Sequence, residues 1–350
     1  MPILEQTQQD QSSSILKKAI SIYTSDLAEI EERQRILGNE INLDLQGLVN
    51  ESTDKIEESC FKFETQFNGD PKELSEMKKQ FRTSIHPWYS QSWLMTQATT
   101  KPKGFPGDFK LLERIYENVP VISGADGNSQ NSQGVGLYLD RWFLDSHLAH
   151  AVRSRKNFMR DYLTLRLKQR EKPLCILNLA SGPCREWQEL SENLDLNGVK
   201  LIGVDIDKEA LEYTKLKLKG MTERGLELNA SEDNILKMAL RKIEPVKDKY
   251  GLQDLVYSIG LFDYLPDNML AKVVTRGYDL LKQNGKMVLA FKDKEMYRTT
   301  RYDWMTDWTF QPRNQTSITQ FLQNNGYASD QTKFFREPLN TIIFYEITKS

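Results

Sequence analysis

The chain has 350 residues, of which 39% are hydrophobic and 27% are charged, and at roughly 150 residues per domain this length predicts about two domains. Its 47 Lys and Arg against 49 Asp and Glu leave a net charge of -2, which argues against a protein that binds nucleic acid through a global basic field. No uncharged apolar run reaches the roughly 20 residues of a membrane-spanning helix.

The first half of the chain is predicted to be helical. Residues 1–12 are polar and show no apolar period, so we expect a disordered tail there. From Ile15 onwards apolar residues recur at helical spacing, and a later helix is expected over 137–170. Residues 13–170 are therefore interpreted as a helical domain.

The pattern changes after Pro173, where short apolar runs alternate with helical periods. The predicted strands are Leu174–Leu179, Lys200–Asp205, Leu226–Asn229, Asp254–Ile259, Lys286–Phe291, Thr332–Arg336 and Thr341–Ile347. Intervening helices favour right-handed βαβ units and a parallel sheet. Only four residues separate the last two strands, which allows a hairpin but no parallel crossover. Residues 171–350 are thus predicted to form an α/β domain with a seven-stranded Rossmann-like sheet ending in an antiparallel hairpin.

A ligand-binding turn is expected where the first strand ends. Ala180, Ser181 and Gly182 are small residues that let the backbone approach a ligand, and the next helix begins with free N–H groups. Asp205 ends the second strand 23 residues after Gly182, the spacing at which an acid meets ribose hydroxyls in doubly wound folds. With Ile206 these residues predict a nucleotide-type cofactor, although the turn alone would be equally typical of an ordinary βα connection.

Two cofactors compete for this arrangement, a dinucleotide and S-adenosylmethionine (AdoMet). A dinucleotide favours a fuller Gly-x-Gly-x-x-Gly turn, because its pyrophosphate needs close backbone approach at several points. AdoMet carries no phosphate, so the looser Ala-Ser-Gly-Pro turn of residues 180–183 suffices. The closing antiparallel hairpin also matches the methyltransferase sheet, and both features favour AdoMet.

Further cofactor contacts are expected after the third and fourth strands. Asp233, with Asn234 as second choice, is a candidate acceptor for the adenine amino group, and each is an equally good candidate to cap the next helix. Ser258 and Gly260 follow the fourth strand. There the backbone is expected to pass the methionine part of the cofactor.

Several segments together resemble the methyltransferase family that includes synthases of extracellular 3-hydroxy fatty acid methyl ester signals. The similar segments, within about residues 80–350, are Lys103–Phe109, Ala151–Arg155, Leu179–Glu186, Asp205–Asp207, Tyr257–Pro266 and Trp304–Trp308. The cofactor segments are shared by many methyltransferases, whereas Gly-Phe-Pro-Gly-Asp, Ala-Val-Arg-Ser-Arg and Gly-Leu-Phe-Asp-Tyr-Leu are more specific. The resemblance implies AdoMet-dependent methyl transfer, with the helical domain covering the acceptor pocket, and does not fix the acceptor.

The acceptor decides which side chains the chemistry needs. A carboxylate is already an anion and needs a cation to orient it, so Arg153 and Arg155 are candidates because guanidinium groups match carboxylates. A solvated helix face or a surface ion pair would explain the two arginines equally well. A hydroxyl or amine acceptor requires a general base, for which His147 and His150 are candidates and Asp263 or Tyr264 alternatives.

The sequence therefore predicts an AdoMet-dependent O-methyltransferase of a small molecule, most simply the carboxylate of a hydroxy fatty acid or a related metabolite. A hydroxyl or amine methyltransferase and a non-catalytic AdoMet-binding sensor remain alternatives. The long N-terminal helices are a candidate homodimer interface, and nucleic acid is not an expected partner. Three cysteines without paired spacing and three histidines predict a cytoplasmic protein with no disulfides and no metal site.

Overall fold

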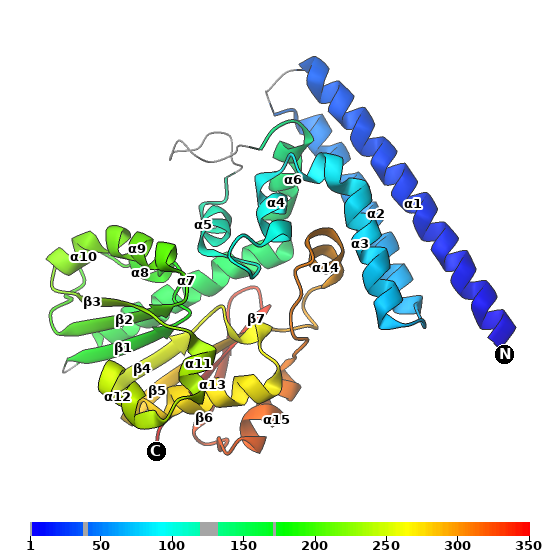
Figure 1. Cartoon of the computed structure of the whole chain (residues 1–350). Helices are drawn as coiled ribbons and strands as arrows, with labels where there is room; N and C mark the ends of the chain where they lie inside the picture. The colour runs from blue at the N-terminus through cyan, green and yellow to red at the C-terminus, as the bar shows by residue number, and fades with distance from the viewer. Residues whose placement is uncertain (1, 38–40, 120–131, 171–172) are drawn as a thin grey trace. The chain divides into compact units, whose positions relative to one another are not determined.

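The computed structural model describes residues 2–37, 41–119, 132–170 and 173–350. These residues form two compact units (Figure 1), which we name the helical unit, Met1–Ala149 with Arg298–Thr309, and the sheet unit, His150–Tyr297 with Phe310–Ser350. The chain therefore crosses between the units three times, after Ala149, after Tyr297 and after Thr309.

The first crossing lies well before the domain boundary that we expected after residue 170. Most of helix α7 (His147–Lys168) belongs to the sheet unit. The reason is packing: the ring of Phe158 stacks on that of Phe344 in the sheet, with centroids 4.2 Å apart. Amphipathic spacing shows that a helix has an apolar face, but it does not show which partner covers that face.

Four helices of the helical unit begin at residues whose side chains cap them. Its elements are α1 (Pro2–Leu37), α2 (Leu43–Gln66), α3 (Pro71–Tyr89), α4 (Trp93–Thr100), α5 (Phe109–Glu117), α6 (Val135–Leu144) and α14 (Thr300–Thr306). The side chains of Asn42, Asp70, Ser92 and Asp108 accept backbone N–H groups at the starts of α2, α3, α4 and α5. The single helix expected over 137–170 is interrupted between α6 and α7.

Helix α1 corrects the expected disordered tail, because its helical backbone already begins at Pro2. Proline is well tolerated in the first helical turn, and residues 3–12 contain strong helix formers and no further Gly or Pro. Further along, α1 exposes Ile15, Ile22 and Ile36 by 61%, 53% and 76%. The homodimer through the N-terminal helices stays a prediction.

Helix α14 belongs to the helical unit because of the tryptophan at its centre. Trp304 is fully buried, and its ring lies edge-on to Phe63 and Phe81 at 6.1 and 5.7 Å between centroids. Its indole N–H donates to Glu64 at 3.0 Å. The neighbouring Asp303 pairs with Lys78. These contacts join a segment near residue 300 to helices from the first quarter of the chain.

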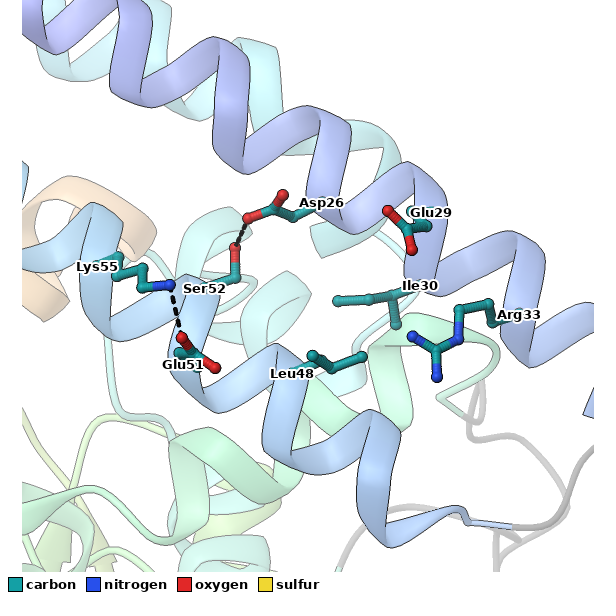
Figure 2. A pocket seen from close by; sticks show the side chains of 8 residues that line it. All are labelled: Asp26, Glu29, Ile30, Arg33, Leu48, Glu51, Ser52 and Lys55. Carbon is teal, nitrogen blue, oxygen red and sulfur yellow. Dashed lines mark hydrogen bonds and ion pairs between the residues drawn. The ribbon is translucent and has the colours of Figure 1, made fainter.

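A surface hollow of about 220 Å³ lies between α1 and α2 of the helical unit (Figure 2). Its lining is largely charged, and several of its polar groups bond one another. The Ser52 hydroxyl donates to Asp26 at 2.6 Å, and Lys55 pairs with Glu51 at 2.6 Å. This hollow contains none of the predicted site residues.

The sheet unit confirms the predicted seven-stranded sheet. Its strands are β1 (Leu174–Leu179), β2 (Val199–Asp205), β3 (Glu227–Glu232), β4 (Gln253–Ser258), β5 (Leu281–Lys292), β6 (Thr332–Arg336) and β7 (Ile342–Thr348). They lie in the order β3-β2-β1-β4-β5-β7-β6. The first five pair in parallel, and β7 is antiparallel to both β5 and β6. The expected antiparallel hairpin is therefore present.

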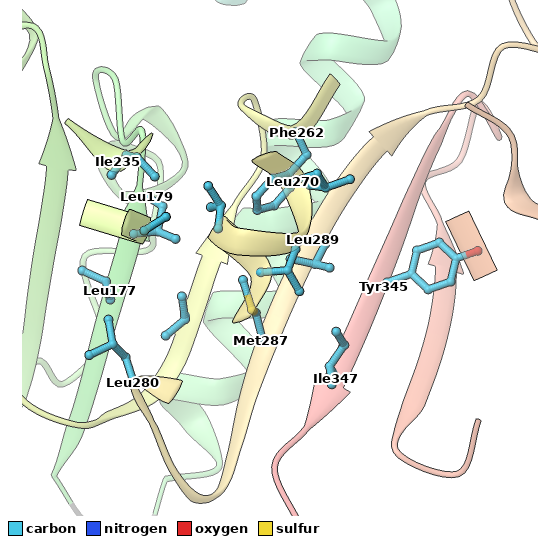
Figure 3. Packing of buried hydrophobic residues seen from close by; sticks show 14 of the residues in the cluster. Leu177, Leu179, Ile235, Phe262, Leu270, Leu280, Met287, Leu289, Tyr345 and Ile347 are labelled. Carbon is cyan, nitrogen blue, oxygen red and sulfur yellow. The ribbon is translucent and has the colours of Figure 1, made fainter. Parts of the chain in front are cut away.

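Apolar side chains on the sheet and on the helices beside it form the main core of this unit (Figure 3). The helical elements are α8 (Arg185–Gln188), α9 (Lys208–Lys217), α10 (Lys219–Glu223), α11 (Ile235–Leu240), α12 (Ile243–Tyr250), the 3₁₀ turn η1 (Phe262–Tyr264), α13 (Asp267–Asp279) and α15 (Gln315–Asn324). Strands β1, β2, β4 and β5 are largely buried along their length. This burial explains their nearly continuous apolar runs, because a covered parallel sheet has no solvent face.

The strand order positions a ligand crevice. From β1 the chain moves outward to β2 and β3, whereas β4 and β5 continue on the other side of β1. In open α/β sheets such a reversal leaves a crevice at the carboxyl ends of the two central strands, here β1 and β4. Among the described helices, none combines the length and the apolar character needed to cross a membrane.

Candidate active site at the carboxyl ends of the strands

The loop between β1 and α8 has an unusual backbone. Ala180, Gly182 and Cys184 have φ angles of 52°, 51° and 51°. A left-handed conformation costs a residue with a side chain about 1–2 kcal/mol, and such strain is concentrated at functional sites. The intervening Ser181 is buried and donates its N–H to Val204 O at 3.0 Å. The loop is thus held against β2 in a strained conformation.

Open space adjoins Gly182, because a Cβ atom built there would meet no atom within 4 Å. We expect Gly182→Ala to weaken binding of S-adenosylhomocysteine (AdoHcy), the demethylated cofactor, about tenfold, since one methyl group of steric conflict is worth about 1 kcal/mol or more. Isothermal calorimetry measures this change. Gly326→Ala is the matched control, because Gly326 also has a positive φ, 88°, and an unobstructed Cβ position. Equal affinity losses in the two variants would contradict a cofactor at Gly182.

Asp205 connects the loop to β2. Its carboxylate accepts the N–H of Gly182 at 2.7 Å and that of Asp207 at 2.9 Å. Burial raises its pKa, and the charge of Asp207 adds to this effect while the backbone N–H groups oppose it. A carboxylate has about four acceptor positions, so these two bonds leave capacity for a ribose diol. The adjacent Ile206 is 54% exposed.

Asp207 caps α9, accepting the N–H of Glu209 at 3.0 Å. Asn234, the second choice for the adenine amino group, caps α11 in the same way by accepting the N–H of Lys237 at 3.0 Å. The capping alternative therefore describes the side chain of Asn234.

The structure disfavours Asp233 as the acceptor for adenine. Its two oxygens accept both guanidinium arms of Arg241 at 2.7 and 2.8 Å, the Tyr250 hydroxyl at 2.7 Å and the Lys249 ammonium at 3.1 Å. The N–H of Asn234 is a fifth donor, at 2.8 Å. Five donors exceed the four lone-pair positions of a carboxylate. Sequence reasoning missed this cluster because its partners follow Asp233 by 8 to 17 positions.

Asp233→Asn is expected to reduce the stability of the protein rather than its cofactor affinity. Burial alone raises the pKa of Asp233, but Arg241, Tyr250 and Lys249 outweigh this effect and hold the pKa well below its ordinary value. The stabilisation is therefore present above about pH 4, the unfolded value, and is lost as the pH falls towards the folded pKa. The variant should lose about 2 kcal/mol at pH 7, and its unfolding free energy should vary less between pH 5 and pH 2 in urea titrations.

Arg155 of α7 lies beside the loop that follows β4. A Cβ atom built at Gly260 would be 3.8 Å from Nη2 of Arg155. The arginine is only 3% exposed, its Nε has no hydrogen-bond partner among the described residues, and no ion pair involving it occurs there. A buried guanidinium is costly unless an anion compensates it. Nearby, the buried Ser258 hydroxyl also has no partner in the described part of the chain.

The structure separates the two candidate arginines. Arg153 and Arg155 are two positions apart on α7, so they point in directions about 200° apart around the helix. Arg155 lies beside Gly260, whereas Arg153 is half-buried on another face. His147, the candidate base, is exposed at the start of α7 and belongs to the helical unit.

A buried carboxylate near Arg155 was not anticipated from the sequence. Glu186 accepts the Tyr257 hydroxyl at 2.6 Å and the Asn178 amide at 3.1 Å, and the Trp187 indole donates to the same tyrosine at 2.8 Å. Burial raises the pKa of Glu186, while Tyr257 and the charge of Arg155 favour its ionised form. In the sequence, Glu186 stands at the end of the turn segment Leu179–Glu186, which could have indicated a functional carboxylate. Residue spacing alone did not reveal which side chains bond it.

A buried ion pair lies at the carboxyl end of β5. Lys292, the last residue of β5, is 4% exposed and contacts Oδ2 of Asp263 at 2.6 Å. Oδ1 of the same aspartate accepts the backbone N–H of Lys292 at 2.8 Å. Tyr264 is half-buried, and the lysine Nζ lies 5.6 Å from the centre of its ring. The sequence feature that could have indicated this buried pair was a lysine at the end of an otherwise apolar strand segment. Among the described residues, no group of His, Cys, Asp and Glu is arranged to hold a metal ion.

No protein-family model matches the sequence. One curated relative, the S-adenosylmethionine-dependent methyltransferase UmaA of Mycobacterium tuberculosis, is 28% identical over 132 residues, which are 36% of this chain and 41% of UmaA. The chain therefore matches about two fifths of the length of this relative.

The fold occurs in a solved structure. A possible exported protein from Bordetella parapertussis covers 97% of this chain and 96% of its own, with 16% identity and a TM-score of 0.54. The carbon methyltransferase CurJ covers 99% of this chain and 94% of its own, with 10% identity and a TM-score of 0.49. At these identities the first similarity establishes the fold and not the activity.

Proposed function

We propose that the chain is an AdoMet-dependent methyltransferase that acts on a small molecule. The observation that carries this proposal is the set of groups at the carboxyl ends of β1, β2 and β4: the strained loop around Gly182, the buried Asp205 and the buried guanidinium of Arg155, whose Nε has no hydrogen-bond partner among the described residues. The similarity to UmaA, whose name gives the same cofactor, supports it.

The residues at the crevice suit AdoMet. Asp205 has acceptor capacity for the two ribose hydroxyls, and the space beside Gly182 admits a ligand close to the backbone. The Ser258 hydroxyl, which has no partner among the described residues, offers a polar contact at the end of β4. AdoMet, when bound, supplies a methyl group on a positively charged sulfur. The adenine contact is not assigned to Asp233, because its carboxylate is fully engaged.

For the acceptor we propose a carboxylate, such as that of a hydroxy fatty acid or a related metabolite. The buried guanidinium of Arg155 supports this choice, since it would hold and orient an anion without removing a proton from it. Positioning a reactive group near the methyl donor can by itself account for a large part of the acceleration. A carboxylate acceptor needs no general base, so the site would rely on orientation of the acceptor.

Binding and turnover measurements on the full chain test the proposal. Calorimetry should detect AdoHcy, and methyl-labelled AdoMet should label acyl carboxylates but not the matching alcohols or amines. Labelling of the alcohols or amines instead would favour the hydroxyl or amine alternative. Binding without any transfer across the panel would favour a sensor. If neither AdoMet nor AdoHcy binds, the proposed function is wrong.

A further inference from the structure

Lys292 is the residue at this end of the sheet that the proposed function leaves without a role. It is nearly as buried as Arg155, with exposures of 4% and 3%. Its Nζ has one carboxylate partner, Asp263 at 2.6 Å, in the described part of the chain. A lysine ammonium has three donors, so this single carboxylate partner leaves donor capacity for a ligand.

The two cations act on each other. Burial lowers the pKa of Lys292, Asp263 raises it, and the positive charge of Arg155 lowers it again. Glu186 offsets part of the charge of Arg155, but repulsion between two buried cations remains unfavourable. Arg155 lies beside Gly260, and Lys292 is bonded to Asp263 three positions further along the same loop, so an acceptor anion bound at this loop would relieve the repulsion.

Aromatic rings lie beside the ammonium group of Lys292. Its Nζ lies 4.1 Å from the centre of the Phe310 ring. Phe310 lies 5.6 Å from Tyr264 and 6.3 Å from Tyr297 between ring centroids. All three rings are partly exposed. The ammonium group of Lys292 is thus adjacent to partly exposed aromatic rings.

We propose that Lys292 is a second acceptor-binding cation, which clamps the acceptor carboxylate together with Arg155 while Tyr264, Tyr297 and Phe310 contact the apolar carbons next to it. Asp263 is a positioning residue that holds the lysine through both carboxylate oxygens. The inference rests on the proposed function and narrows its acceptor to a carboxylate attached to an apolar body.

The charge of the site also bears on product release. In the reaction, a carboxylate oxygen of the acceptor forms a bond to the methyl carbon while the bond from that carbon to sulfur breaks. The electron pair of the broken bond stays on sulfur, and no proton is released. The ester is neutral, so Lys292 and Arg155 attract it less than the substrate. Free carboxylate should therefore outcompete its methyl ester for the site.

Lys292→Met tests the clamp in the full-length protein. We expect the KM for the carboxylate acceptor to rise about ten- to a hundredfold, the value of one hydrogen bond to a charged group. AdoHcy affinity should stay within about twofold, and methyl-ester inhibition should change little. Lys292→Arg should restore part of the loss. The double variant Lys292→Met with Asp263→Asn guards against misfolding, since it removes both charges while the Asn oxygen can still accept the backbone N–H.

Lys286→Met is the matched control. Lys286 lies on the same strand and forms an ion pair with the buried Glu346, so its loss should also reduce stability but leave the acceptor KM unchanged. The clamp would be overturned if Lys286→Met and Lys292→Met changed the acceptor KM equally. It would also be overturned if the KM stayed unchanged in both Lys292→Met and the double variant with Asp263→Asn. A selective loss of AdoHcy affinity in Lys292→Met would assign the cation to the cofactor and would also overturn it. Failure of the unmodified protein to bind AdoHcy would instead defeat the proposed function itself.

Discussion

Asp205→Asn should weaken AdoHcy binding about a hundredfold, because a carboxylate that accepts two ribose hydroxyls contributes about 1.5–3 kcal/mol per hydrogen bond and an amide oxygen contributes less. The substitution preserves the shape of the side chain. Calorimetry on the full chain gives the affinity directly. The variant should also unfold more readily, since Asp205 holds the N–H groups of Gly182 and Asp207.

The affinity of the unmodified protein should depend on pH in a particular direction. Burial raises the pKa of Asp205, and the ionised form is the one that accepts both hydroxyls. AdoHcy affinity should therefore fall as the pH falls through this raised pKa, beginning at a higher pH than for an ordinary aspartate. The Asp205→Asn variant should lack this dependence.

A second aspartate serves as the control. Asp254, at the amino end of β4, accepts the N–H of Cys175 at 2.7 Å and pairs with Lys282 at 2.7 Å. Asp254→Asn should therefore lower stability without changing AdoHcy affinity. If Asp205→Asn behaves like this control, the ribose assignment is wrong.

Replacing Arg155 with Met should lower kcat/KM for a carboxylate acceptor about a hundredfold or more, because truncating one partner of a buried charge pair costs about 2–5 kcal/mol. AdoHcy affinity should change by less than about threefold, which separates an acceptor contact from a cofactor contact. Stability should fall only modestly, because Arg155 has no ion pair among the described residues, although its charge favours the ionised form of the buried Glu186. Initial-rate kinetics over a range of acceptor concentrations measure the effect.

Arg166 provides the matched comparison on the same helix. It lies about three turns beyond Arg155, and its Nε is also buried without a partner among the described residues. Arg166→Met should leave acceptor kinetics unchanged. The opposite result would be a loss of AdoHcy binding in Arg155→Met with little change in acceptor KM at saturating cofactor. It would mean that the guanidinium contacts the cofactor and not the acceptor.

The sheet was predictable because its signals are local. The first predicted strand, Leu174–Leu179, has the same bounds in the structure, and the last connection was too short for a parallel crossover. Strand β5 is longer than expected because it begins at Leu281, five positions before the predicted start. Polar residues at its amino end gave no apolar run to mark the extension.

The residues that the sequence did not predict are those whose environment is set by distant partners. Asp233 could be placed after β3, but its engagement by Arg241 and Tyr250 depends on how α11 and α12 return to it. Arg155 and Arg153 look alike in the sequence, and only the fold shows which one lies beside Gly260. Lys292 meets Asp263 across 29 positions. Pairings of this kind have no sequence period.

The path of the chain has a practical consequence for dissecting the protein. A truncation that begins at residue 171 would retain Arg298–Thr309 but remove the helices against which Trp304 is buried. A fragment ending at residue 170 would lack that same insert. Either recombinant half would therefore expose apolar surface that the intact chain covers, which invites aggregation. The function of either unit is therefore best studied by substitutions in the intact chain.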